Sequence, residues 1–580
     1  MLLVLKRDGT QVPFDREKII NAINAAFLEV DGEIYETDTA NDIADEIEDT
    51  IYDFYYRRNY NATTWSEMVE QMSRLFSVED IQDLIEEYLM RSERRDVARA
   101  YIRFRYKREV ARERHSDFIN AIKERLEAKN VKNQNANVDE ASFGGRAGEA
   151  GSYLTKDYAL NYIVSKMAKE NHLNNMIYIH DLDSYAVGSH NCLSIPFDDL
   201  LANGFNTRQT DVRPAGSVST AFQLVAVIFQ LQSLQQFGGV SATHLDWTMV
   251  PYVRKSFRKH WNDGLKYLSF WEVNEKDFFV EDLPIDQYIN VDDYIDIYDY
   301  AMNMTKREIY QAAEGLYHNL NTLQSRSGNQ LPFTSINYGT CTLPEGRMIT
   351  EALLNVSIEG LGKKKKTSIF PCGIFQVMKG VNKEPGTPNY DLYRLALRST
   401  AQRLYPNYAN VDWSGNVGYD RNDPRTYFST MGCRTANGWD INGFGQLKDG
   451  RGNICPVTII MPTLAKMAVD QYINASYADA RDYITSFMKL LDQKIDEAKE
   501  MLIERFEWIC SQSPASAKFM YENGLMAGYI PEEGIRSALK HGTLAIGQLG
   551  LAETLQILIG TDHTTTEGME LAKQIENLFK

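Results

Sequence analysis

The chain has 580 residues, of which 43% are hydrophobic and 24% charged, so it is long enough for two or more globular units with ordinary cores. Its formal net charge of −17 argues against nonspecific nucleic-acid binding, which needs basic surface, although a local nucleotide pocket is still allowed. No apolar run approaches the ~20 residues of a membrane span, and the first residues do not have the apolar core of a signal peptide. We therefore expect a cytoplasmic protein that contacts no membrane.

Residues 1–105 are predicted to form the first unit. Two short strands, over residues 3–6 and 11–14, are joined by a turn, and Asp15 then caps a helix that runs from Arg16 to about Leu28. Further helices are predicted over residues 39–55, over residues 66–76, and from residue 78 past residue 99.

Basic residues on the predicted hairpin suggest a phosphate site, since phosphates bind where Lys and Arg side chains meet backbone N–H groups. The alternative is a solvated basic turn. Beyond this argument, residues 4–9, 12–19 and 95–102 resemble the ATP-cone, a regulatory nucleotide-binding domain at the front of many ribonucleotide reductases. The resemblance implies that ATP supports activity and dATP suppresses it. It assigns ATP/dATP binding to Lys6, Arg7, Asp8, Gly9 and Lys18.

Residues 106–580 are predicted to form the second unit, and its alternation of strands and helices favours an α/β fold. A charged helix over residues 106–129 would connect the units, and another helix is expected over residues 156–170. A strand over residues 177–182 ends in polar residues and is followed by His190, Asn191 and Cys192. Polar residues after a strand mark the place where α/β barrels carry their chemistry, although ordinary turn residues would give the same pattern.

Later segments of this unit are predicted more coarsely. We expect a buried helix over residues 222–233, an acidic and aromatic solvated face or insertion over 270–303, a strand over 331–340, a solvated loop at the four lysines 363–366, a strand over 541–547 and an amphipathic helix over 566–580. Phosphate contact is the alternative for the four lysines.

The stretch over residues 428–455 is too rich in Gly, Asn and Asp to be a helix interior, and it predicts a loop that doubles back on itself. Cys433 lies near the tip, where a loop can push a thiol into a cavity that no regular element would reach. The alternative for any single cysteine is a small buried apolar side chain. The nearest other cysteine is Cys455, 22 residues away (455 − 433), so no pair has zinc-ligand spacing and we expect no bound metal.

Residues 431–435 and 450–453 resemble the active-cysteine loop of the anaerobic (class III) ribonucleotide reductases, which are glycyl radical enzymes. The resemblance implies a ten-stranded α/β barrel with a loop that carries the radical cysteine into its centre. It implies that Cys433 forms a transient thiyl radical, that Cys192 hands a hydrogen to the substrate, and that Asn453 holds polar intermediates. We place Asn191, Ser335 and Asn337 in the substrate site.

The same resemblance implies anaerobic reduction of ribonucleoside triphosphates to deoxyribonucleoside triphosphates, with ATP, dATP and other deoxynucleotides as effectors. Asn453 favours the branch of the family that uses formate, whereas a second branch uses a dithiol and places extra sulfur near this position. Cys455, two residues further on, leaves that choice open. The resemblance also implies a radical S-adenosylmethionine activase as a partner and a homodimer or higher homo-oligomer. We expect no nucleic-acid partner.

One feature of the family pattern is not found in this sequence. The family ends with a four-cysteine zinc site and a radical glycine in an Arg-Val-x-Gly-Tyr-like loop, and Val417-Gly418-Tyr419 and Ala527-Gly528-Tyr529 are interpreted as ordinary turns. We expect the C-terminal glycyl radical domain to be absent from residues 106–580 and the radical to come from outside, through truncation or a separate small polypeptide. Two alternatives are another glycyl radical enzyme, which predicts adjacent cysteines and no ATP-cone, and a nucleotide-sensing subunit without catalysis.

Overall fold

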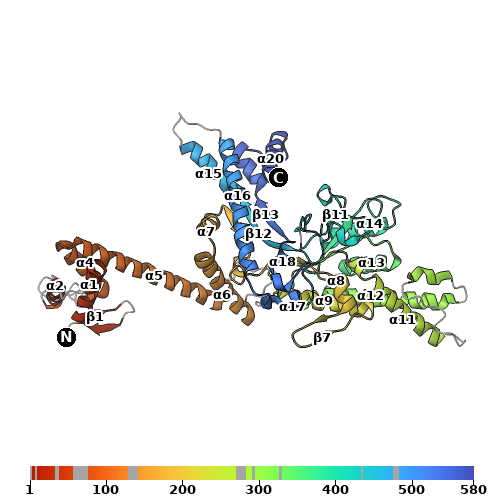
Figure 1. The fold of residues 1–580 in the computed structure, drawn as a ribbon, viewed down its shortest axis with the longest axis horizontal. Coiled ribbons are helices and arrows are strands. Elements are labelled where there is room, and N and C mark those ends of the chain that lie inside the picture. Colours follow the sequence, from red (N-terminus) through yellow and green to blue (C-terminus); the bar gives the residue numbers. More distant parts are fainter. Residues whose placement is uncertain are drawn as a thin grey trace. The chain divides into compact units, whose positions relative to one another are not determined.

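The computed structural model describes residues 3–6, 10–32, 38–56, 76–127, 141–268, 283–290, 294–324, 330–432, 435–474 and 483–580. The chain divides into two compact units, Met1–Glu124 and Arg125–Lys580 (Figure 1). Among the described residues, no helix is long and apolar enough to cross a membrane.

The N-terminal unit packs helices on a small sheet. Strand β1 (Leu3–Leu5) pairs antiparallel with β2 (Gln11–Pro13) and parallel with β3 (Phe76–Ser77). The helices are α1 (Arg16–Asp31), α2 (Asp38–Tyr56), α4 (Val78–Arg91) and the long α5 (Arg95–Glu127). Apolar residues at helical spacing, such as Ile19, Ile23 and Phe27 of α1, form one buried cluster with those of the other helices. The predicted hairpin and first two helices are confirmed.

Three expectations in this unit are wrong in detail. A helix is predicted over residues 66–76, but Phe76 lies in strand β3. Residues 66–75 lie outside the described residues. The helix predicted from residue 78 past 99 is two helices, because Ser92 takes extended geometry and its hydroxyl caps the Leu89 carbonyl at 2.7 Å. The connector predicted from residue 106 is the continuation of α5.

The second unit is built around a five-stranded parallel sheet in the order β11-β10-β9-β8-β5. Its strands are β5 (Leu193–Ser194), β8 (Val240–Ala242), β9 (Thr334–Tyr338), β10 (Cys372–Val377) and β11 (Asn407–Asn410). Every residue of β8 and β9 is buried. This is typical of parallel strands, whose two faces are both covered by other parts of the chain.

A second sheet of three strands has the order β13-β12-β4. Strand β12 (Asn453–Ile460) pairs parallel with β13 (Thr543–Leu549) and antiparallel with β4 (Ile177–Ile179). A small hairpin is formed by β6 (Phe205–Asn206) and β7 (Asp211–Val212). The strands predicted over residues 177–182 and 331–340 are confirmed with shorter bounds, and the strand predicted over 541–547 is confirmed but shifted to Thr543–Leu549.

Helices surround these sheets (Figure 1). They are α6 (Phe143–Tyr158), α7 (Lys166–Leu173), α8 (Phe197–Asn203), α9 (Val218–Ser233), α10 (Leu245–Thr248), α11 (Val250–Leu268), α12 (Ile295–Thr322), α13 (Pro344–Glu359), α14 (Tyr390–Arg403), α15 (Met461–Asn474), α16 (Tyr483–Cys510), α17 (Lys518–Glu522), α18 (Arg536–Leu539), α19 (Leu551–Ile559) and α20 (Thr566–Leu578). The single helix expected over residues 156–170 is wrong, because a π-helical turn at Ala159–Ile163 and a break at Val164 and Ser165 separate α6 from α7.

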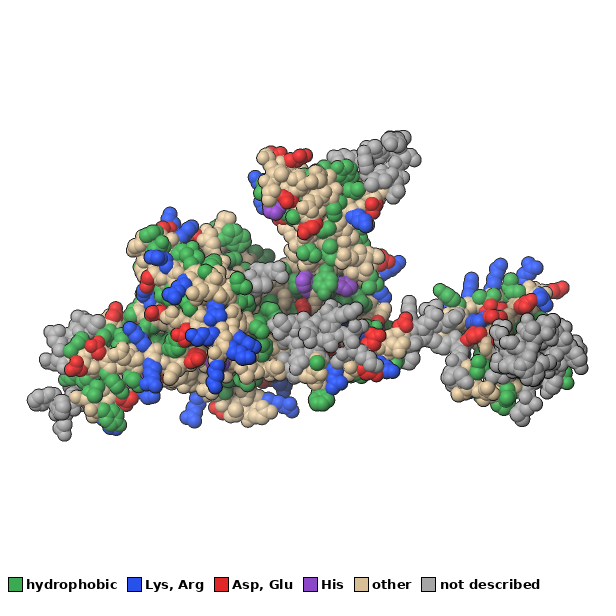
Figure 2. Space-filling model, turned by 180° about the vertical axis from the view of Figure 1, so that it is seen from behind, with side chains coloured by type: hydrophobic (Ala, Val, Ile, Leu, Met, Phe, Trp, Pro, Cys, Tyr) green, Lys and Arg blue, Asp and Glu red, His purple; other side chains and the backbone are tan. Residues whose placement is uncertain are grey.

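Two predicted surface features have different outcomes. The four lysines at 363–366 lie in an exposed turn closed by a bridge between Leu361 and Lys366, so the solvated loop is confirmed. Much of the acidic stretch 270–303 lies outside the described residues. The end of the stretch forms the start of α12, where Ile297 and Tyr298 are buried. On the face shown in Figure 2, side chains of both charge signs are interspersed with apolar ones.

The expected α/β fold class with a mainly helical N-terminal unit is confirmed. In the second unit, the strands of the described residues form sheets of five, three and two strands, so closure into a ten-stranded barrel stays a prediction.

Candidate active site

Cys192 lies at the seam where the two sheets meet. On one side, the Leu193 N–H donates to the Gly239 carbonyl at 3.0 Å, next to β8. On the other side, three backbone bonds of 2.9 Å join this segment to the start of β12: Asn191 N–H to Ile454 O, Cys192 N–H to Asn453 O and Ser194 N–H to Arg451 O. The seam places Cys192 and Asn453, far apart in sequence, on adjacent backbones.

The Cys192 thiol is buried and held by two hydrogen bonds. The Gly239 N–H donates to Sγ at 3.2 Å, and Sγ donates to Asn191 Oδ1 at 3.3 Å. A Cβ on Gly238 would stand 2.5 Å from the backbone carbonyl carbon and oxygen of Asn191, so no other residue fits at 238 without a shift of the backbone. The side chain of Asn191, predicted to bind substrate, thus orients the thiol in this structure.

The inner face of the five-stranded sheet carries a row of small polar side chains. Strand register aligns Ser194 with Ser241, and Ser241 with Ser335. Side chains two positions apart on a strand point to the same face, so Asn337 on β9 lies on the face of Ser335. Gln376 on β10 lies on this face too, because it is two residues after Ile374, the partner of Asn337. These side chains line the surface on which the cysteine loop lies.

The first limb of the loop, defined as Phe428–Gly432, is bound by this row. Asn337 makes a two-point contact with Thr430: its amide donates to the Thr430 carbonyl at 3.0 Å and its Oδ1 accepts from the Thr430 N–H at 3.1 Å. The Ser241 hydroxyl donates to the same carbonyl at 3.0 Å, and the Ser335 hydroxyl accepts from the Gly432 N–H at 2.9 Å. Ser335 and Asn337, predicted to bind substrate, therefore bind the loop backbone.

Gly432, the last described residue of the first limb, lies beside the residue that binds the Cys192 thiol. Its φ of +65° is a turn conformation that favours glycine, and Met431 N–H donates to Thr435 O at 2.6 Å to close the turn. A Cβ on Gly239 would stand 3.6 Å from Gly432 N, so Gly432 lies against the residue that donates to Cys192 Sγ. Cys433 itself, next in the chain, lies outside the described residues.

The second limb, defined as Thr435–Gly452, is anchored by buried cations. The Arg451 guanidinium donates to four backbone carbonyls, those of His541 (2.7 Å), Gly445 (3.3 Å), Leu447 (2.6 Å) and Gly438 (2.9 Å). Lys448 donates to the Asn437 carbonyl at 3.0 Å and to Gln446 Oε1 at 2.6 Å. Burial, followed by the nearby charge of Arg451, lowers the pKa of Lys448 to about 8.

Two carboxylates tie the same limb to its surroundings. Asp440 pairs with His541 at 2.8 Å. Asp449 accepts from the Thr243 hydroxyl at 2.5 Å, and His244, between Asp449 and Asp198, contacts Asp198 Oδ2 at 3.1 Å. Although burial opposes protonation, the charges of Asp449 and Asp198 raise the pKa of His244 to about 9, and burial raises the pKa of Asp449 to about 6.

A β-bulge in β12 separates Asn453 from Cys455. Asn453 is aligned with Thr543 and Cys455 with the next residue, Leu544, so the register shifts between them. Since consecutive residues of β13 point to opposite faces, so do Asn453 and Cys455. The Cys455 thiol lies against the Leu502 carbonyl of α16 at 3.7 Å, and burial raises its pKa to about 12. Asn453 is buried, and its Oδ1 has no hydrogen-bond partner among the described residues.

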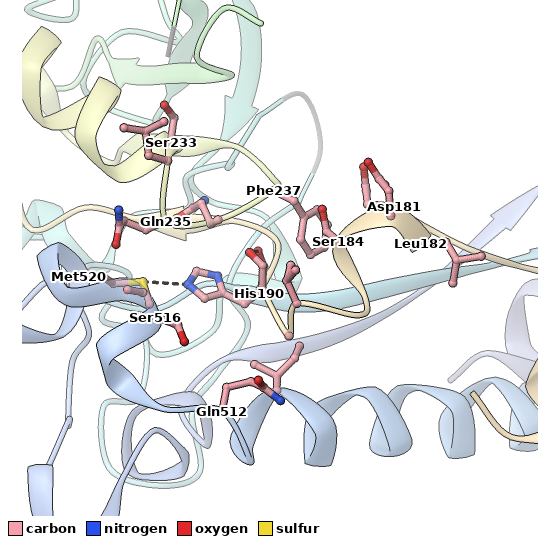
Figure 3. Close-up of a pocket in the computed structure, with 18 of the residues that line it drawn as sticks. Asp181, Leu182, Ser184, His190, Ser233, Gln235, Phe237, Gln512, Ser516 and Met520 are labelled. Carbon is pink, nitrogen blue, oxygen red and sulfur yellow. Dashed lines mark hydrogen bonds between the residues drawn. The ribbon is translucent and has the colours of Figure 1, made fainter. Parts of the chain in front are cut away.

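A cavity of about 710 Å³ is lined in part by His190, two residues before Cys192 (Figure 3). Its lining residues include His190, Gln236 and Phe237 from the chain on either side of Cys192, and Gln512 and Met520 from the C-terminal part of the chain. His190 Nε2 lies 2.9 Å from Met520 Sδ, and burial lowers the pKa of His190 to about 4. This imidazole is therefore neutral at pH 7.

The predicted nucleotide residues of the N-terminal unit are only partly described. Lys6 lies after β1, and its N–H donates to the Thr10 carbonyl at 2.8 Å across the hairpin. Lys18 is exposed and pairs with Asp15 at 3.3 Å. Asp15 is the N-cap residue of α1, but the side-chain cap predicted for it is wrong, because its side chain makes no capping hydrogen bond. Arg7, Asp8 and Gly9 lie outside the described residues. Their role in binding ATP or dATP stays a prediction.

Sequence reasoning missed Ser241 and Gln376, which bind the loop, as well as Arg451 and Gln236. A signal existed for the first two, because each is a polar residue at an alternate position of a short apolar strand. Gly418 and Gly528 have φ values of +83° and +75°, as the turns predicted at these positions require. The described residues contain no group of three or more His, Cys, Asp or Glu side chains able to hold a metal ion.

Comparison with known proteins gives the class of the chain. Residues 134–578 match the family model of the anaerobic ribonucleoside-triphosphate reductase, and residues 2–110 match that of the ATP cone domain. The chain therefore belongs to the anaerobic ribonucleoside-triphosphate reductase family, an oxidoreductase family, and its N-terminal unit carries an ATP cone domain. The resemblance seen in the sequence is confirmed.

Individual relatives agree with this family. The chain is 28% identical over 567 residues to the anaerobic ribonucleoside-triphosphate reductase of Haemophilus influenzae, covering 97% of this chain and 71% of the relative. It is 28% identical over 581 residues to that of Escherichia coli, covering 99% and 72%. The crystal structure of the anaerobic ribonucleotide reductase from Thermotoga maritima in complex with dATP and CTP has a similar fold, with a TM-score of 0.51 at 17% identity over 76% of this chain and 67% of that one.

Proposed function

We propose that this chain supplies the catalytic thiols for anaerobic reduction of ribonucleoside triphosphates to deoxyribonucleoside triphosphates. One observation carries the proposal: the backbone of Gly432, which precedes Cys433, lies against Gly239, and the Gly239 N–H donates to Cys192 Sγ. The residue before Cys433 thus lies beside the residue that binds the Cys192 thiol, although the two cysteines are 241 residues apart in sequence (433 − 192). Family membership gives the reaction to which such a pair is suited.

The chemistry divides between the two thiols. A glycyl radical from outside the described residues, installed by a radical S-adenosylmethionine activase, supplies the one-electron oxidation of the Cys433 thiol. Cys433 then takes the 3′ hydrogen of the ribose, the 2′ hydroxyl is protonated and leaves as water, and Cys192 supplies a hydrogen atom to C2′. The 3′ hydrogen returns from Cys433 at the end of the cycle.

Formate is the proposed reductant. The balance is then one ribonucleoside triphosphate, one formate and one proton to one deoxyribonucleoside triphosphate, one carbon dioxide and one water. A dithiol route needs a further thiol beside the site, and Cys455, the nearest in sequence, contacts Leu502 on the opposite face of β12. Asn453, whose buried Oδ1 has no partner among the described residues, is proposed to hold the polar intermediates.

Asn191, Ser335 and Asn337 belong to this site as positioning residues. Asn191 accepts from the Cys192 thiol, while Ser335 and Asn337 bind the first limb. Direct contact of the three with substrate remains our proposal from the sequence. We further propose that ATP and dATP act through the ATP cone, that other deoxynucleotides act as effectors, and that the enzyme is a homodimer or higher homo-oligomer.

The deciding experiment is anaerobic turnover of a ribonucleoside triphosphate with formate, with and without a pre-activated glycyl radical polypeptide. We expect product with the addition, and a loss of about 10³-fold or more in Cys192→Ala and in Cys433→Ala. Cys510→Ala is the matched control, because Cys510 is half-buried at the end of α16, and it should keep parental turnover. Parental turnover in Cys433→Ala would overturn the proposal.

A further inference from the structure

The amide of Gln236 links the two backbone segments that hold the Cys192 thiol. Its Nε2 donates to the Asn191 carbonyl at 2.9 Å and to the Gly239 carbonyl at 2.8 Å. Asn191 directly precedes Cys192, and Gly239 provides the N–H that binds Sγ. Each proton of one NH₂ group is therefore used, one on each side of the thiol. Gln236 is 4% exposed.

The far side of the same amide is fixed as well. Gln236 Oε1 accepts from Gln232 Nε2 at 2.7 Å, and Gln232 is fully buried in α9. A flipped Gln236 amide would place its oxygen against two carbonyl oxygens, so only one orientation satisfies the network. Gln232 Nε2 also lies 3.2 Å from Met520 Sδ, which His190 contacts from the cavity side (Figure 3).

Every side chain of this network is uncharged at pH 7. The imidazole of His190 is neutral because burial lowers its pKa to about 4. Gln232, Gln236 and Met520 do not titrate. The geometry that the network imposes is therefore the same across the physiological pH range. Gln236 is bonded to Gln232 of α9 and to the carbonyls of Asn191 and Gly239, so it connects the packing of α9 to the position of Cys192.

We propose that Gln236 is a positioning residue for Cys192: by holding the Asn191 and Gly239 carbonyls at a set separation, it keeps the Gly239 N–H on Sγ and aims the S–H bond. This inference rests on the proposed role of Cys192 as hydrogen donor. Hydrogen transfer depends on approach within fractions of an ångström, and a misplacement of about 1 Å can cost about 10²-fold in rate.

The test compares Gln236→Met and Gln236→Glu with Gln235→Glu as the matched control. Gln235 is the adjacent residue and makes neither bond to the Cys192 segments. Turnover with formate and the pre-activated glycyl radical polypeptide gives kcat and KM. We expect kcat to fall by about 10- to 100-fold in both Gln236 variants with KM within about twofold of the parent, and Gln235→Glu to match the parent.

A second readout does not need turnover. The rate of Cys192 alkylation by iodoacetamide is followed against pH in the full chain by peptide mass spectrometry, with Cys372 as internal standard. Loss of the Gly239 N–H bond removes a donor that stabilises the thiolate, so the midpoint for Cys192 should rise in both Gln236 variants while that of Cys372 stays constant. A merely structural role would shift neither midpoint.

Gln232→Met covers the case in which a Gln236 variant fails to fold, because it releases the amide from the far side without touching either segment. It should show the same changes at about 3- to 10-fold in kcat. Parental kcat and a parental Cys192 midpoint in a folded Gln236→Met or Gln232→Met would overturn the proposal. Equal turnover in the parent and Cys192→Ala would instead overturn the proposed function, and the alkylation profiles would still decide the role of Gln236.

Discussion

The two limbs of the cysteine loop are held by opposite kinds of chemistry. The first limb, Phe428–Gly432, is bound by neutral hydroxyl and amide groups of Ser241, Ser335, Asn337 and Gln376. The second limb, Thr435–Gly452, is anchored by the buried side chains of Arg451 and Lys448 and by carboxylates that pair with histidines. The first limb, which directly precedes Cys433, is therefore held by the groups least sensitive to pH.

This difference has a physical reason. Each hydrogen bond from a neutral side chain to the first limb contributes about 1 kcal/mol to stability. These bonds hold the limb without placing a charge beside it. Buried cations cost several kcal/mol to desolvate and are stable only when carbonyls surround them, as they surround Arg451. The second limb can thus carry large stabilising and pH-dependent terms, because carbonyls surround its cations and histidines pair with its carboxylates. Four predictions test this division, from the largest expected effect to the smallest.

Arg451→Met should destabilise the fold by about 3–5 kcal/mol, because four buried carbonyls lose their donor. Urea unfolding measures the change. Arg421→Met is the control: Arg421 is an exposed arginine paired with Asp412, and its loss should cost less than about 1 kcal/mol. Equal costs for the two variants would show that the second limb does not depend on its buried cation.

Asn337→Leu should cost about 2–3 kcal/mol and lower turnover by about 100-fold, because it leaves the Thr430 N–H and carbonyl without their amide partner. Gln376→Leu removes one bond, to the Phe428 carbonyl, farther from the tip. Its effect on turnover should be smaller. If Gln376→Leu were the more damaging change, the two-point clamp at Thr430 would not be what places the tip.

His244→Gln should reveal the titration of the second limb. The folded-state pKa of His244 is raised to about 9 from 6.5, so its stabilisation is fully present below pH 6.5 and is lost as pH rises to 9. The stability difference between parent and variant should fall by about 2 kcal/mol across this window, measured by denaturant unfolding at each pH. Asp449 titrates below this pH window, because its pKa is about 6.

The first limb provides the comparison for that profile. Asn337→Leu removes no titratable group, so its stability difference from the parent should be flat between pH 6.5 and 9. A slope in Asn337→Leu that matched the slope in His244→Gln would mean that the two limbs share one titration.

Cys455→Ala should have the smallest effect. Its thiol faces Leu502 across the bulge, so formate-dependent turnover should stay within about twofold of the parent and stability should fall by about 1 kcal/mol. Turnover is measured with formate and separately with a dithiol. Loss of turnover in this variant would place Cys455 in the chemistry and would favour the dithiol route.

The cysteine loop and its family could be predicted from short sequence motifs. Gly and Asn around Cys433 indicate a loop, and the motif around it matches one family. The contacts of Ser335 and Asn337 could not be predicted, because a polar residue on a barrel strand can face substrate or another part of the chain. Only the folded loop, lying on that face, shows that their hydrogen bonds go to Thr430 and Gly432.

The sequence by itself determined the family, the ATP cone and the two cysteines, since these depend on local motifs that survive without neighbours. The tertiary structure alone decided which backbones flank Cys192, that Gln236 bridges them, and that Asn453 and Cys455 face opposite ways. The physical reason is register: a bulge of one residue reverses the face of everything after it, and strand pairing between residues hundreds of positions apart is set by packing of the whole core.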